Sequence, residues 1–246
     1  MKLLAFDTST ERLAIGVSGP GVRLALEAEG GPLASSTLLP QIRSLLARAG
    51  LAFGELDAIA FGRGPGAFTG LRASCAVAQG LGFGLGRPLL PIDSLLVVAE
   101  GARGGDRTVA ATSERPLEIA VAMDARMDEV YAARYRWNGG GDGGWTVLDA
   151  PALYTLEALA AQWRDARPDL VAGSALAAFG ERLRLPEAAR RVPREQARAD
   201  ALLRLAEAAA HAGAGIDAAA ALPLYLRDKV ALTTAERDAA RAAAGR

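Results

Sequence analysis

Residues 61–72 read FGRGPGAFTGLR, a stretch whose four glycines separate an apolar run from an amphipathic one. Residues 56–61 predict a short strand, and residues 70–85 predict a helix. A glycine-rich loop between a strand and a helix can point backbone N–H groups at an anion. The loop lacks the Lys-Ser/Thr pair of a P-loop and does not fit G-x-G-x-x-G. Two interpretations stay open: a phosphate cradle with Gly64 and Gly66 as candidate contacts, or glycines that permit positive φ in a tight turn.

The predicted helix 70–85 carries small residues along one face. Ala76, Gly80 and Gly84 recur at intervals of four and therefore lie one above another. Each interior glycine costs a helix about 1 kcal/mol relative to alanine. A helix that keeps such glycines is expected to have a closely approaching neighbour, which is either another element of this chain or a partner subunit.

The surrounding sequence predicts a mixed α/β unit, because a meander of three strands is followed by alternating helices and strands. The expected bounds are 2–8, 13–18 and 22–29 for these strands, 36–49 for a helix closed by Gly50, 89–92 for a strand and 94–101 for a short helix. This order of elements is typical of one half of an actin-like fold.

A second block repeats the start of the first, since the strand at 117–123 ends in Asp124 as the first strand ends in Asp7. Strands at 129–137, 145–148 and 170–172 and helices at 155–166, 175–183 and 199–212 are expected to follow. The predicted fold class is α/β, a duplicated actin-like (ribonuclease H-like) fold with two lobes of mixed sheet flanked by helices. The expected division is a first lobe at 1–100 and a smaller second lobe at 101–235. The second lobe begins with a connection at 101–116 and contains a flexible hairpin loop at 138–144. A late helix of the second lobe is expected to pack back on the first, and residues 236–246 are expected to form a flexible tail.

The composition excludes several classes of chemistry. Cys75 is the only cysteine and His211 the only histidine, so no internal disulfide, cysteine cluster, zinc-hydrolase motif or serine-type triad can form. His211 is expected on the surface of an alanine-rich helix. Lys plus Arg equals Asp plus Glu, 28 each, which argues against a strongly basic nucleic-acid binder. No apolar run is long enough to span a membrane, and the expected location is cytoplasmic.

The segment Asp7-Thr8-Ser9 lies where actin-fold ATPases place their first phosphate loop, and its residues are candidate nucleotide contacts. Such loops normally contain a glycine that lets the backbone approach the phosphates, and none is present here. The corresponding turn that begins at Asp124 also lacks glycine. The missing glycines argue against an ATP site in this chain, so a stand-alone ATPase or small-molecule kinase is only the alternative function. The structural alternative is an aspartate that only caps a turn.

Six segments, in order and correctly spaced, give the chain a resemblance to the TsaB family. They are FDTST at 6–10, LLPQI at 38–42, LDAIAFGRGPGAFTGLR at 56–72, AQGL at 78–81, MDARMDEVY at 123–131 and PLYLRDKVA at 223–231. Many relatives have a histidine shortly before LLP, where this chain has Ala34. An old family label, glycoprotease, suggests a peptidase, but no metal-binding or nucleophile–base arrangement supports that activity.

The resemblance implies an accessory scaffold with no catalytic residue, no metal and no cofactor of its own. It implies pairing with a catalytic TsaD-like subunit and a TsaE-like ATPase in forming threonylcarbamoyladenosine beside the tRNA anticodon. ATP and threonylcarbamoyl-AMP would serve that complex, and tRNA would be reached through it. The family pattern maps the partner interface onto two helices, with Leu38, Leu39, Ile42, Leu45, Arg72, Ala76, Gly80 and Gly84 as its predicted residues. The isolated chain is expected to form a homodimer through the same surface.

Overall fold

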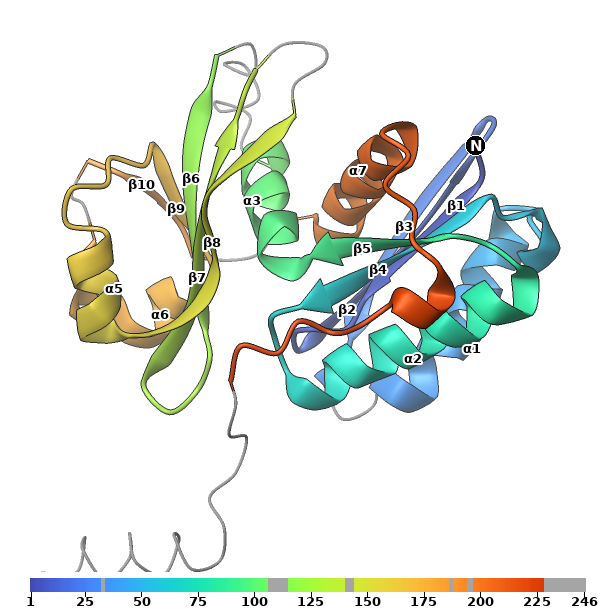
Figure 1. Cartoon of the computed structure of the whole chain (residues 1–246), viewed down its shortest axis with the longest axis horizontal. Coiled ribbons are helices and arrows are strands. Elements are labelled where there is room, and N and C mark those ends of the chain that lie inside the picture. The colour runs from blue at the N-terminus through green and yellow to red at the C-terminus, as the bar shows by residue number, and fades with distance from the viewer. Residues whose placement is uncertain (32–33, 106–114, 140–143, 186–187, 194–196, 228–246) are drawn as a thin grey trace, which may run out of the picture.

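The computed structural model describes residues 1–31, 34–105, 115–139, 144–185, 188–193 and 197–227, which form two five-stranded mixed sheets (Figure 1). The first sheet has the order β3-β2-β1-β4-β5 and the second the order β10-β9-β6-β7-β8. The strands of the first sheet are β1 (Leu3–Asp7), β2 (Arg12–Gly19), β3 (Val22–Glu29), β4 (Ala58–Gly64) and β5 (Leu89–Asp93). Those of the second are β6 (Leu117–Asp124), β7 (Glu129–Trp137), β8 (Trp145–Thr155), β9 (Leu170–Ala172) and β10 (Arg190–Val192).

The two sheets share one topology. In the first, β1 pairs with β2 antiparallel and with β4 parallel. In the second, β6 pairs with β7 antiparallel and with β9 parallel. Strand β6 is therefore paired in the same pattern as β1, with one antiparallel and one parallel neighbour. Asp124 ends β6 as Asp7 ends β1. The predicted duplicated α/β fold is confirmed.

Helices cover both faces of the first sheet (Figure 1). Because side chains alternate along a strand, Leu4 and Phe6 of β1 pack in the core beneath α1 (Ala34–Arg48) and α2 (Phe68–Leu85). Leu3 and Ala5 point the other way, into the core beneath α7 (Arg198–His211). Helix α3 (Ser94–Gly105) lies between the two sheets and contacts both α7 and β6. The second sheet is covered on its outer face by α5 (Leu156–Gln162) and α6 (Ala175–Phe179).

Glycines end both helices of the lower layer in Figure 1. Gly50 follows α1 with a φ of +66°, and Gly86 follows α2 with a φ of +61°. A left-handed residue after the last turn lets backbone N–H groups return to the final carbonyls, and glycine adopts this conformation without a Cβ clash. The predicted role of Gly50 is therefore confirmed.

Within the described residues, no helix combines the length and the hydropathy needed to cross a membrane.

Several predicted bounds are wrong, and the strand predicted at 56–61 is β4 at Ala58–Gly64. Helix α3 continues to Gly105, β8 continues to Thr155, and the helix predicted at 155–166 ends at Gln162. The helix predicted at 175–183 becomes 3₁₀ from Gly180 onward, and the short strand β10 was not expected. Strands of three residues carry too little periodicity to be recognised, and pairing with β9 alone defines β10. Most of the 101–116 connection, most of the 138–144 loop and the whole 236–246 tail lie outside the described residues.

Candidate functional site

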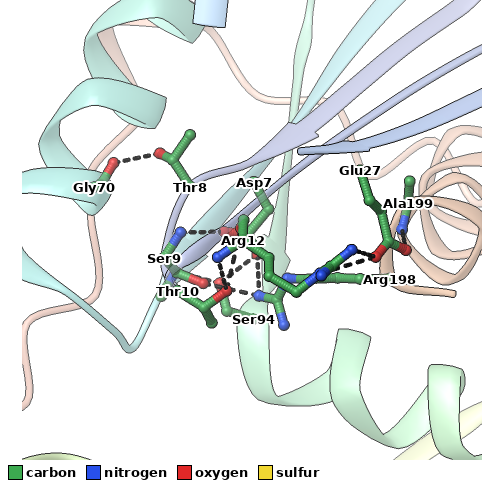
Figure 2. A network of polar contacts seen from close by, with 11 residues as sticks. Asp7, Thr8, Ser9, Thr10, Arg12, Glu27, Gly70, Ser94, Arg198 and Ala199 are labelled. Atoms are coloured by element: carbon green, nitrogen blue, oxygen red, sulfur yellow. Dashed lines mark hydrogen bonds and ion pairs between the residues drawn. The ribbon is translucent and has the colours of Figure 1, made fainter. Parts of the chain in front are cut away.

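Asp7 is fully buried at the carboxyl end of β1, where its carboxylate accepts three hydrogen bonds (Figure 2). Oδ1 accepts from the backbone N–H of Ser9 at 2.6 Å. Oδ2 accepts from the hydroxyl of Ser94 and from Nη2 of Arg198, each at 2.8 Å. Arg198, the first residue of α7, is 1% exposed, and Nη2 also donates to Ser9 Oγ at 2.8 Å. The buried carboxylate is therefore neutralised from within the chain, where a nucleotide or metal would have to displace Arg198.

Thr8 and Ser9 hold the turn after β1 tightly against the glycine-rich loop. Thr8 Oγ1 donates to the carbonyl of Gly70 at 2.6 Å, and the N–H of Ala67 donates to the carbonyl of Ser9 at 2.7 Å. A Cβ on Gly66 would overlap the Ser9 carbonyl, and one on Gly70 would overlap the Thr8 carbonyl. These glycines are therefore required by a close approach of two backbones.

Gly64, the last residue of β4, differs from Gly62, Gly66 and Gly70, because it alone among them has a positive φ, +110°. Its N–H donates to Ser94 Oγ at 3.1 Å. The N–H groups of Gly64 and Ala67 are thus engaged inside the chain. The turn interpretation is confirmed for Gly64, and packing against β1 explains Gly66. The prediction that these two glycines contact a phosphate stays untested.

The second lobe repeats part of this arrangement. Asp124 Oδ1 accepts from the N–H of Arg126 at 2.8 Å, which is the turn made by Asp7 and Ser9. The Asp124 N–H donates to Ser174 Oγ at 3.1 Å. Arg126 also reaches across to the first lobe, where Nη2 lies 2.6 Å from Oε1 of Glu11, but both side chains are largely exposed. The duplication thus extends to the strand-ending aspartates.

The two aspartate turns face a cleft of about 910 Å³ between the lobes. Its walls come from both lobes and include Ser9–Arg12, Gly66–Phe68, Met123–Met127 and Leu224–Arg227. Each arginine that lines it has a carboxylate partner within the chain: Arg12 with Glu27, Arg126 with Glu11, Arg198 with Asp7 and Arg227 with Glu129. The positive charge of each of these arginines is therefore compensated within the chain.

The residue types that bind metals do not cluster in the part of the chain that the structure describes. No group of three or more His, Cys, Asp and Glu residues is placed to hold a metal ion among those residues. His211 lies on the exposed surface of α7, with Nδ1 2.8 Å from the carbonyl oxygen of Glu207. The prediction of a helix-surface histidine is confirmed.

The partner interface predicted on α1 is wrong for three of its four residues. Leu38, Ile42 and Leu45 are 0% exposed and pack in the core between α1 and the first sheet. The apolar stripe that marked them is the stripe that any helix buries against its own sheet. Leu39 points outward and is 41% exposed.

The predicted residues of α2 lie on its outer face. Ala76, Gly80 and Gly84 are exposed, and a Cβ added at Gly80 or Gly84 would meet nothing within 4 Å. Gly82, by contrast, has a close neighbour within this chain, because a Cβ there would press on Ala218 and Leu89. The small-residue face at Gly80 and Gly84 thus has no neighbour among the described residues.

Arg72 and Phe83 modify this picture of the outer face. Arg72 is exposed, but its guanidinium carbon lies 3.7 Å from the ring centre of Phe68 and Nε donates to the hydroxyl of Tyr225 at 3.0 Å. Phe83 lies one turn from Gly80 and is 65% exposed, but the sequence did not lead us to predict it as an interface residue. The signal that could have identified it is an aromatic residue outside the buried stripe of a helix. Arg198 was also missed, although a cation in the first turn of a helix opposes the helix dipole and marks a site with another purpose.

Cys75 gives a simple test of the α2 packing. The side chain is buried and Sγ donates to the carbonyl of Ala221 at 3.4 Å. Burial raises the pKa of the Cys75 thiol, so little thiolate is present at neutral pH. We expect a thiol-specific reagent to label the native protein at least about a hundredfold more slowly than the denatured protein, because reaction requires local opening. Equal rates in both states would show that α2 is not packed as described.

Comparisons with known proteins converge on one family. A family model described as TsaD, tRNA N6-adenosine threonylcarbamoyltransferase, matches residues 33–144. The "tRNA threonylcarbamoyladenosine biosynthesis protein TsaB" of Haemophilus influenzae is 37% identical over 131 residues, covering 53% of this chain and 52% of that protein. The Escherichia coli protein of the same name is 34% identical over 145 residues, covering 56% and 59%. The aligned part thus spans somewhat more than half the length of these curated relatives.

Two solved structures match over nearly their whole length. An uncharacterized Pseudomonas aeruginosa protein, described as similar to peptidase YeaZ, is 37% identical with a TM-score of 0.78, covering 92% of this chain and 99% of that one. YeaZ from Pseudomonas aeruginosa is 36% identical with a TM-score of 0.76, covering 92% and 100%. With this identity over a complete shared fold, the chain belongs to the TsaB (YeaZ) family.

Proposed function

We propose that this chain is an accessory subunit in the formation of tRNA threonylcarbamoyladenosine, at the adenosine beside the anticodon. It pairs with a TsaD-like catalytic subunit and works with a TsaE-like ATPase. The chain itself contributes no catalytic group, and tRNA, ATP and threonylcarbamoyl-AMP are engaged by the complex. The names of the curated relatives place those proteins in this biosynthesis and support the proposal.

The observation that carries the proposal is the open outer face of α2. Gly80 and Gly84 sit in the interior of an 18-residue helix, where each costs about 1 kcal/mol relative to alanine. Nothing in the described chain approaches them within 4 Å of a Cβ position. Small residues let a second helix come close, and the exposed Leu39 of α1 and Phe83 of α2 would supply apolar contact. A partner helix accounts for glycines that the chain's own packing does not use.

The Asp7 network supports a role without catalysis. Its carboxylate is neutralised by Arg198, and each cleft arginine is paired with a carboxylate of the chain. A general acid or base needs a titratable group that can reach a substrate, and Asp7 is fully buried. The reacting groups are therefore assigned to the TsaD-like subunit. In its absence, we propose that the exposed α1–α2 face forms a homodimer.

Replacing Gly80 with leucine is expected to abolish binding to the TsaD-like subunit while the chain stays folded. The new side chain meets nothing within the chain, but it would occupy the space that a partner helix needs. Ala158→Leu is the matched control, because Ala158 is an exposed residue of α5 on the second lobe. Co-purification with the TsaD-like subunit and isothermal titration calorimetry measure the pairing. Undiminished binding by the Gly80→Leu variant would remove the interface from α2.

A further inference from the structure

The segment 221–227, here called the strap, runs from the first lobe to the second along one side of α2 (Figure 1). It follows the short 3₁₀ helix Ala218–Ala220, which packs against α2. Four of its residues, Leu224–Arg227, line the cleft. The strap crosses the cleft on a different side from α3, whose Leu95 and Val98 join the core of the second lobe. Among the described residues, buried apolar packing at α3 and the strap both join the lobes, in addition to the exposed ion pair between Arg126 and Glu11.

The strap is attached to the first lobe at three points. The carbonyl of Ala221 accepts from Nε2 of Gln79 at 2.9 Å, besides its contact with the Cys75 thiol. The N–H of Leu224 donates to the carbonyl of Arg63 in β4 at 2.7 Å. The ring of Tyr225 lies 5.5 Å from the ring of Phe68, and its hydroxyl accepts from Arg72. These contacts fix the strap to the helix that carries the proposed partner face.

Arg227 attaches the strap to the second lobe. Its Nη2 donates to the carbonyls of Ala125 at 3.0 Å and Arg126 at 3.3 Å, and to the carboxylate of Glu129. Its Nη1 lies 3.2 Å from Sδ of Met127. The guanidinium thus contacts three residues of the turn between β6 and β7 and the first residue of β7.

This turn has a conformation that needs such support. Arg126, Met127 and Asp128 have φ values of +64°, +58° and +57°, and none of them is glycine. Consecutive non-glycine residues in the left-handed region are held there only by surrounding contacts. Arg227 supplies contacts to the two backbone carbonyls before Met127, those of Ala125 and Arg126, and to the Glu129 side chain beyond the turn.

We propose that the strap is an interlobe latch, in which Arg227 holds the second lobe at a set distance from the first and so fixes the width of the cleft. Release of Arg227 frees the lobes to separate about α3. The latch needs no partner and no nucleotide, so it stands or falls independently of the proposed function. Because Tyr225 and Arg72 join the strap to α2, the latch also links the cleft to the outer face of that helix.

The test measures the distance between the lobes in the full chain. Spin labels at Arg48→Cys on α1 and Glu157→Cys on α5 report this distance by double electron–electron resonance, and the native Cys75 is buried. Arg227→Met, which keeps the length but removes every donor, is expected to add a second population at longer distance. Glu129→Gln weakens the same latch from the opposite side and is expected to shift the distribution in the same direction.

Arg182→Met is the matched control. Its ion pair with Asp128 lies on the same turn, but both side chains are more than half exposed and both belong to the second lobe. An unchanged distance distribution is expected for this variant. Circular dichroism and cooperative thermal unfolding establish that each variant is folded.

Hydrogen exchange gives an independent readout of the latch. In the Arg227→Met variant, the Leu224 amide is expected to exchange at least about tenfold faster, because its end of the strap is no longer held. The Leu89 amide donates to the carbonyl of Ile216 upstream of the strap and should keep its rate. A folded Arg227→Met protein with unchanged distances and unchanged Leu224 exchange would overturn the proposal.

Discussion

Replacing Arg198 with methionine is expected to lower the free energy of unfolding by about 3–5 kcal/mol, because it leaves the charge of Asp7 buried without its partner. The side chains of Arg198 and Asp7 are 1% and 0% exposed, with 2.8 Å between Nη2 and Oδ2. The remaining hydrogen bonds from Ser94 and Ser9 do not carry a full charge. Urea denaturation followed by circular dichroism measures the loss.

Arg12→Met is the matched control for this experiment. Arg12 lies in the same network (Figure 2), but its side chain is 57% exposed and its partner Glu27 is 22% exposed. Exposed ion pairs contribute about 0–1 kcal/mol, so a change in this range is expected. The double variant Asp7→Asn, Arg198→Met is expected to lose less than the sum of the two single losses. Equal small losses for Arg198→Met and Arg12→Met would contradict the assignment of Arg198 as the counter-ion of Asp7.

Alanine at Gly70 and alanine at Gly80 are expected to have opposite effects on stability, although both positions lie in α2. A Cβ at Gly70 would overlap the carbonyl oxygen of Thr8, which is backbone and cannot rotate away. Overpacking of this kind costs about 1–3 kcal/mol, and the Thr8–Gly70 hydrogen bond would be strained as well. At Gly80 the Cβ meets nothing, and alanine is expected to stabilise the isolated chain by about 1 kcal/mol.

The midpoints of thermal unfolding of the two variants measure this difference, and each variant serves as the other's control. If both variants lost stability alike, the glycines of α2 would share one structural role. A loss of stability for the Gly70 variant with a gain for the Gly80 variant would distinguish a glycine that packs inside the chain from one that is open on the surface. Binding measurements with the same Gly80→Ala protein then show how much room the partner requires.

Much of the candidate site was visible in the sequence as positions but not as roles. The glycine pattern marked Gly66, Gly70 and Gly80 equally, because spacing records only where a side chain is missing. In the structure, the first two receive the backbone of the turn after β1, while Gly80 faces open space. On α1, the stripe that includes Leu38 looked like an interface and is core, since burial against a sheet and burial against a partner produce the same periodicity.

The long-range contacts could not be predicted from local patterns. Asp7 and Arg198 are separated by 191 positions in the sequence. Cys75 and its contact in the strap, Ala221, are separated by 146 positions. Propensity and periodicity describe neighbours within one element, so they contain no signal for such pairs. The strap has no regular secondary structure at all, and only its contacts with both lobes distinguish it from a loop.

The sequence by itself determined the family, the duplicated α/β fold and the lack of histidine and cysteine chemistry, because motif order, strand alternation and composition are local properties that a chain carries unfolded. The tertiary structure decided the rest. It brought Arg198 onto Asp7, turned the stripe of α1 inward and left the face of α2 at Gly80 and Gly84 open. These outcomes depend on which surfaces meet when the sheets and helices pack, and packing joins residues that the sequence keeps far apart.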